Sequence, residues 1–233
     1  MKSALRQGIR HGIPIGLGYL SVSFAFGMKA VGDGLIVLQA VLISMTNLTS
    51  AGQIAALPLM VGGASLAEMA LTQLTINLRY ALMSLSLSRK LDGSMGTLQR
   101  LIFSFANTDE IFAVSSSQPG KVGKYYLYGL MLAPWIGWSL GTFLGAAAGT
   151  LLPAFVRSAL GIAIYGMFLA IILPPARKNG HVCFVVLVAV ALSLCFHYIP
   201  GLNQVSSGFV IIICGVLAAA AGAWLFPAEE EAV

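Results

Sequence analysis

Charged side chains are scarce in this chain. Only 9% of its 233 residues are Asp, Glu, Lys or Arg, whereas about 25% is usual in a soluble domain. Hydrophobic residues make up 58% of the sequence, and apolar runs recur from residue 13 to residue 226. Runs of roughly 20 such residues are long enough for a helix to cross a bilayer core of about 30 Å. The composition therefore excludes an ordinary soluble domain and predicts an all-α, polytopic membrane bundle.

Several signatures of other protein classes are also missing. The period-two alternation of membrane β-strands is absent, as are the zinc-protease, P-loop and dinucleotide-binding patterns. The three cysteines lie in apolar runs without a CxxC pair, and the three histidines are far apart in the sequence. Basic residues stand at the ends of apolar runs and form no patch with interleaved aromatics. We therefore predict no enzyme activity, no cofactor, no metal site and no nucleic-acid partner.

Eight hydrophobic segments follow one another along the chain, and we expect one transmembrane domain over residues 1–233. A basic stretch at 1–12 precedes an uncleaved first span, and an acidic tail occupies 227–233. Pro174 and Pro175 are expected to end one segment. The expected segments are about 13–29, 34–63, 66–88, 101–117, 125–150, 158–175, 182–199 and 205–226.

The basic residues indicate how the segments cross the membrane, because cytoplasmic loops are enriched in Lys and Arg. If residues 34–63 and 101–117 each return to their own side, Lys29 and Arg157 are outside and Arg79 lies in the membrane. The remaining basic stretches, 1–12, 89–100, 121–124 and 177–178, are then cytoplasmic. If residues 34–63 span instead, the 89–100 loop is outside. We favour the first topology, with a cytoplasmic N-terminus.

The segment 34–63 is too long for one straight span. As a single helix it would reach about 45 Å at 1.5 Å per residue, well beyond the bilayer core. Its middle, SMTNLTSAGQ, is polar, so we predict two half-helices joined by an unwound turn. Non-helical backbone at membrane depth is buried in protein or lines a cavity. The turn supplies candidate substrate ligands, Asn47, Thr49, Ser50, Gly52 and Gln53, although such hydroxyls also bond to their own helix carbonyls.

The segment 66–88 carries polar residues at helical spacing. One stripe holds Gln73, Asn77 and Tyr80, and the adjacent stripe holds Glu68 and Arg79. An arginine at the bilayer centre costs at least ~2.5 kcal/mol, so it needs a partner or an aqueous cavity. Two interpretations stay open. Arg79 either binds a substrate carboxylate in a bidentate manner or forms a structural ion pair.

Asp109 and Glu110 are adjacent acids in an otherwise apolar segment that is short and polar enough to be re-entrant. They are candidates for proton or ion coupling, for pairing with Arg79, or for a position at the membrane interface. Glu68 is a third coupling candidate, or it serves the dipole at the start of its helix. Glycines recur at every fourth position from Gly137 to Gly149 and predict a close helix contact, within the chain or between subunits.

The sequence resembles the AzlC family of branched-chain amino acid permeases. The resemblance rests on GIPIGLGYLSVSFAFG, SMTNLTSAGQIA, EMALTQLTINLRYALMSLSLSRKL and TDEIFAVS, all in the first 120 residues. It implies a bacterial inner-membrane carrier that, with a small four-span partner called AzlD, exports branched-chain amino acids or their toxic analogues. The motif residues of the family match Gly52, Gln53, Asn77, Arg79, Asp109 and Glu110.

These observations lead to one hypothesis for function. The chain is a multi-pass secondary transporter subunit for leucine, isoleucine or valine, coupled to protons or another ion. Arg79 or the free N–H groups near Thr49 would take the substrate carboxylate. The ammonium would contact Asn47, Asn77, Asp109 or Glu110. An ion channel and a non-transporting assembly subunit are the alternatives.

Overall fold

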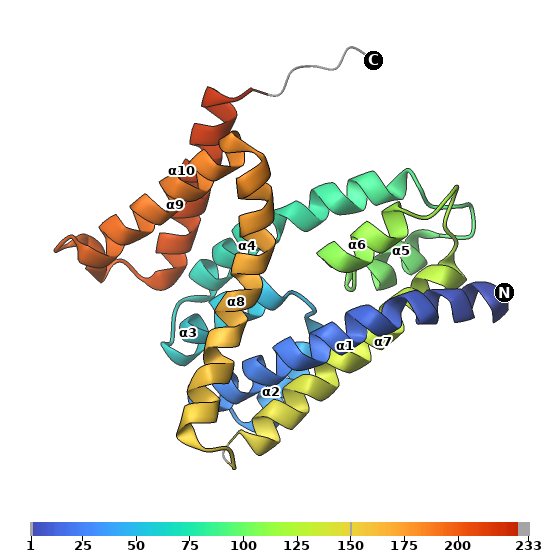
Figure 1. The fold of residues 1–233 in the computed structure, drawn as a ribbon, viewed down its shortest axis with the longest axis horizontal. Coiled ribbons are helices and arrows are strands. Elements are labelled where there is room, and N and C mark those ends of the chain that lie inside the picture. Colours follow the sequence, from blue (N-terminus) through green and yellow to red (C-terminus); the bar gives the residue numbers. More distant parts are fainter. Residues whose placement is uncertain (1, 150, 228–233) are drawn as a thin grey trace. The chain divides into compact units, whose positions relative to one another are not determined.

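The computed structural model describes residues 2–149 and 151–227, which are almost entirely helical (Figure 1). An isolated bridge between Leu91 and Val122 is the only extended pairing in that part of the chain. The all-α prediction is confirmed. The helices are α1 (Lys2–Gly32), α2 (Val37–Thr46), α3 (Ser50–Val61), α4 (Leu66–Ser88), α5 (Thr97–Ser104), α6 (Asp109–Ser116), α7 (Lys124–Ala148), α8 (Ala154–Lys178), α9 (Gly180–Tyr198) and α10 (Ser207–Leu225), with a 3-10 turn at Leu202–Gln204.

Four of the described helices, α1, α7, α9 and α10, are long and apolar enough to cross a membrane. The helices α2 and α3 are apolar but shorter. The chain is therefore a multi-pass membrane protein built of long spans and shorter broken segments.

The helices group into two compact units. The first unit comprises residues 1–57 and 77–164, and the second comprises 58–76 and 165–233. The interpretation of the whole chain as one transmembrane domain stays a prediction. The acidic tail beyond residue 227 lies outside the described residues.

The core of the first unit is the close pairing of α1 with α7, which lie side by side in Figure 1. A Cβ added to Gly145 would lie 1.9 Å from the carbonyl oxygen of Phe24, and one added to Gly137 would lie 2.2 Å from that of Gly16. Only glycine permits backbones to approach so closely. The predicted glycine face is therefore an intramolecular contact.

The same helix carries the string GWSLG at residues 137–141, a match to the hydrolase pattern GxSxG. In hydrolases, that pattern forms a sharp turn between a strand and a helix. Here it lies inside the continuous helix α7, and both of its glycines pack against α1. The match therefore reflects helix packing and not a nucleophile.

Both broken segments are present. The helices α2 and α3 are separated by Asn47–Thr49, where Asn47 is extended and accepts a hydrogen bond from the Thr49 N–H at 3.1 Å. The helices α5 and α6 are separated by residues 105–108, ending in an extended Thr108. The predicted break in 34–63 is confirmed. The second broken segment begins earlier than expected, at Thr97.

Helices α1 and α8 extend further than the sequence-based prediction. Helix α1 begins at Lys2, so residues 2–12 of the basic stretch are helical rather than a separate tail. Helix α8 continues through Pro174 and Pro175 to Lys178. The two prolines lack the two N–H donors that would bond to carbonyls one turn earlier, yet the helix continues for three more residues.

The basic segments of the first unit meet at one end. Asp92 N–H donates to the Val122 carbonyl at 3.0 Å, and Val122 N–H donates to that of Lys90 at 2.9 Å. The His11 ring also bonds the Tyr126 hydroxyl at 2.9 Å. Hydrogen bonds from Ser94 hold the pKa of the Asp92 carboxyl below its usual value. These contacts bring parts of the stretches 2–12, 89–100 and 121–124 together at one end of this unit, while the favoured topology stays a prediction.

Candidate functional site

The two helix breaks of the first unit enclose a pocket of about 260 Å³. Residues from the α2–α3 break form one wall, residues from the α5–α6 break form another, and α4 closes the site. The lining residues are Thr46, Asn47, Leu48, Thr49, Asn77, Tyr80, Ser104, Phe105, Asn107 and Thr108. Discontinuous helices surround the substrate in many transporters because their ends leave backbone groups available for binding. The geometry here is of that kind.

Two polar atoms in the pocket wall are buried without a hydrogen-bond partner in the described chain. They are the Thr49 hydroxyl oxygen and the Asn107 side-chain oxygen. Asn107 is only 3% exposed, and its Nδ2 donates to the Ser84 hydroxyl at 3.0 Å. A buried polar atom left unpaired costs about 1–3 kcal/mol. A ligand with hydrogen-bond donors would satisfy both atoms.

Helices α3 and α6 both begin at the pocket, but their charges differ. The Thr108 hydroxyl caps α6 by accepting from the Ile111 N–H, and Asp109 and Glu110 follow in the first turn. Helix α3 begins directly after Thr49 and has no acidic residue in its first turn. The positive end of a helix dipole favours an anion. The start of α3 is therefore the better position for an anionic group.

Arg79 is paired within the protein. Its Nη1 lies 2.6 Å from the Asp109 carboxylate, and its Nη2 donates to the Tyr80 hydroxyl at 3.1 Å. The guanidinium also lies 4.8 Å from the centre of the Tyr80 ring. Tyr80 lines the pocket, whereas Arg79 is not among its lining residues. Of the two interpretations of Arg79, the structure favours the ion pair.

Glu110 is bound from α1. The Tyr19 hydroxyl donates to the Glu110 carboxylate and also lies 2.7 Å from the Thr108 hydroxyl. The Tyr19 ring packs edge-to-face on Trp138, with 5.3 Å between ring centres. Asp109 and Glu110 are thus bound to different partners, on α4 and α1 respectively.

Gln53 belongs to a buried hydrogen-bond network and does not line the pocket. Trp138 donates its indole N–H to Gln53 Oε1 at 2.8 Å, and Gln53 Nε2 donates to the Ser44 hydroxyl at 3.1 Å. Ser44 in turn bonds Thr142 at 2.7 Å. The network joins both half-helices to α7, so Gln53 holds the break in position.

The other predicted residues lie at several places. Asn47, Thr49, Asn77 and Tyr80 are in the pocket wall. Ser50 and Gly52 stand in the first turn of α3. Gln73 belongs to the second unit, as does Glu68. There Glu68 is buried and accepts a hydrogen bond from Ser206.

Several residues of the site were not predicted from the sequence as ligands or coupling groups, among them Tyr19, Asn107 and Thr108. The Thr108 cap had a local signal, since a threonine followed by two acids is typical of a helix start. Tyr19 and Asn107 had none, because their partners are remote in the sequence. No cluster of three or more potential metal ligands occurs within residues 2–149 and 151–227.

Comparisons with known proteins identify relatives of the chain. The family model described as AzlC protein matches residues 14–152. The chain is 26% identical to the inner membrane protein YgaZ of Escherichia coli K12, over 97% of this chain and 93% of that protein. It is 33% identical to an uncharacterized membrane protein of Archaeoglobus fulgidus, over 90% and 91% of the two chains. No solved structure matches significantly.

Proposed function

Since the chain belongs to the AzlC family, whose members have a membrane transport-related role, we propose that it is the large subunit of a secondary transporter for branched-chain amino acids. The observation that carries this proposal is the pocket between two helix breaks, with its unpaired Thr49 and Asn107 oxygens. A site of about 260 Å³ is slightly smaller than the usual range for small-molecule pockets, roughly 300–1,000 Å³. It is suited to a single amino acid.

The pocket divides into a polar and an apolar part. The first N–H groups of α3 receive the substrate carboxylate, because no acid of that helix turn competes for them. The oxygens of Thr49 and Asn107 accept from the ammonium. Leu48 and Phe105 provide the apolar wall for the side chain. One methylene is worth only about 1–3 kcal/mol in such a pocket, so leucine, isoleucine and valine should overlap as substrates.

Ion coupling is assigned to the carboxylates beside the pocket. Asp109 pairs with Arg79 and Glu110 with Tyr19, and Thr108 in the pocket wall is adjacent to Asp109 in the chain. A proton or cation that takes the place of either partner would change the start of α6 and, with it, the pocket wall. The proposed location is the bacterial inner membrane, with the N-terminus cytoplasmic. The proposed direction is export, and the proposed partner is a small four-span subunit of AzlD type.

Counterflow in proteoliposomes tests this function. Vesicles loaded with unlabelled leucine should accumulate labelled leucine and valine, but not labelled lysine, with and without the small partner. The rate should respond to an imposed pH gradient if protons are coupled. Current without saturable amino acid flux would indicate a channel. Leucine flux in vesicles that contain the small partner without this chain would indicate that this chain is an assembly subunit.

A further inference from the structure

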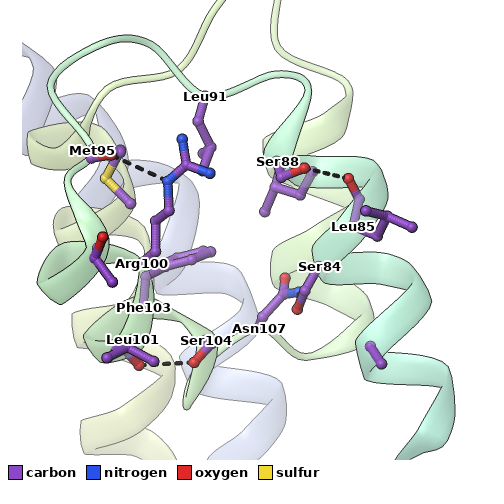
Figure 2. A pocket seen from close by; sticks show the side chains of 13 residues that line it. Ser84, Leu85, Ser88, Leu91, Met95, Arg100, Leu101, Phe103, Ser104 and Asn107 are labelled. Carbon is purple, nitrogen blue, oxygen red and sulfur yellow. Dashed lines mark hydrogen bonds between the residues drawn. The ribbon is translucent and has the colours of Figure 1, made fainter.

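A second pocket of about 420 Å³ lies between the C-terminal half of α4 and helix α5 (Figure 2). Its walls are mainly aliphatic and aromatic, with Leu85, Leu91, Met95, Leu101 and Phe103 among the lining residues. No lining residue is acidic. An apolar pocket with a small number of polar groups is the usual form of a small-molecule site.

Arg100 supplies the positive charge of this outer pocket. Its Nε donates to the Met95 carbonyl at 3.1 Å. Figure 2 shows the Arg100 guanidinium beside Leu91. The ion pairs among the described residues are Lys29–Asp33 and Arg79–Asp109, so no carboxylate of that part neutralises Arg100. A guanidinium has five N–H donors in a planar fork that matches a carboxylate. The pocket therefore combines an apolar wall with an available anion partner.

The outer pocket adjoins the pocket between the helix breaks. Ser104 and Asn107 line both. Asn107, which lines both pockets, donates to the Ser84 hydroxyl of the outer pocket at 3.0 Å, and Figure 2 shows these side chains facing each other from α4 and the α5–α6 break.

We propose that the outer pocket is a second binding site, for the carboxylate and aliphatic chain of a short aliphatic acid, with Arg100 as the carboxylate ligand. Its natural occupant is the transported amino acid, so this part of the inference rests on the proposed function. Because no acidic side chain lines the outer pocket, an amino group is not required for binding there. The inner pocket, with its unpaired oxygens, requires one.

Isocaproate, the leucine skeleton without its amino group, distinguishes the two sites. Equilibrium binding of radiolabelled isocaproate is measured on the full chain in nanodiscs of zwitterionic lipid. We expect saturable binding that Arg100→Gln weakens about tenfold or more, since a hydrogen bond to a charged group is lost. Arg100→Lys should recover part of the affinity. Thr49→Val, which alters only the inner pocket, should leave isocaproate binding unchanged.

The same preparations separate this inference from the proposed function. An isocaproate affinity of Arg100→Gln equal to that of the wild type would overturn the outer site. A loss of isocaproate affinity in Thr49→Val as large as that in Arg100→Gln would also overturn it. Displacement of isocaproate by phosphatidylglycerol in the nanodisc would also overturn it, by identifying the pocket as a lipid site. If the wild type shows Arg100-dependent isocaproate binding but no leucine counterflow, the site stands and the transport function fails.

Discussion

Arg79 and Asp109 form an ion pair of 2.6 Å that joins α4 to the first turn of α6, and each is next in the chain to a residue of the pocket wall, Tyr80 and Thr108 respectively. The pair explains how a guanidinium is accommodated in a segment this apolar, since each charge has an opposite charge beside it. It also ties the position of α6 to α4. The pair therefore links the proposed coupling carboxylates to the pocket wall.

Removing one partner of this ion pair should reduce leucine counterflow more than removing both partners. Arg79→Met leaves the Asp109 carboxylate without a counter-ion, and Asp109→Asn leaves the guanidinium without one, so each single variant should lose most leucine counterflow. The double variant Arg79→Met/Asp109→Asn should recover part of it, because no lone charge remains. A double variant no more active than either single one would show that Arg79 or Asp109 acts on the substrate itself.

The buried hydrogen-bond network around Gln53 should contribute more to the stability of the folded protein than to substrate affinity. Trp138→Phe replaces the indole with a smaller aromatic ring and leaves Gln53 Oε1 buried without its donor, which should cost at least about 1–3 kcal/mol. Thermal unfolding of the detergent-solubilised protein measures the loss. Trp224→Phe is the control, because Trp224 is 84% exposed. A larger effect at Trp224 would contradict the assignment.

The α1–α7 contact should not tolerate a methyl group. Gly145→Ala would place Cβ 1.9 Å from the Phe24 carbonyl oxygen, so the helices must separate and the melting temperature should fall by several degrees. Gly166→Ala, where nothing lies within 4 Å, should be neutral or stabilising by up to about 1 kcal/mol through helix propensity. Equal melting temperatures for the two variants would argue against this packing.

The Tyr19 hydroxyl should affect coupling and not substrate binding. Tyr19→Phe removes the hydrogen bond to Glu110 and keeps the ring on Trp138. We expect leucine counterflow without a gradient to persist, while the stimulation by a pH gradient decreases. Tyr198→Phe, at a ring 73% exposed, serves as the control. Unchanged stimulation in Tyr19→Phe would remove Glu110 from the coupling step.

Local patterns were sufficient to predict the helices and the first break. The boundaries of α4 agree with the prediction at both ends, because polar and glycine residues flank its apolar run. The break at Asn47–Thr49 followed from the length of the segment and the polarity of its middle. The early start of α1 and the continuation of α8 past its prolines were missed. Hydropathy indicates which residues can lie in the bilayer, but it does not indicate where a helix begins or ends.

The site was predicted only in part, since polarity does not state which partner a side chain finds. Gln53 and Asn47 have similar neighbours in the sequence, yet Gln53 belongs to a buried hydrogen-bond network and Asn47 is in the pocket wall. Tyr19 meets Glu110 across 91 positions of the chain. A contact of this range depends on the tertiary packing of α1, which no local motif specifies.

Equilibrium binding of leucine to Thr49→Val and Asn107→Leu variants tests the central claim most directly. Both substitutions keep the approximate size of the side chain and remove an unpaired oxygen from the pocket. We expect each to weaken leucine binding about tenfold or more, while Leu98→Ala, at an exposed position on α5, leaves it unchanged. Leucine affinity equal to wild type in both pocket variants would contradict the assignment of the substrate to this pocket.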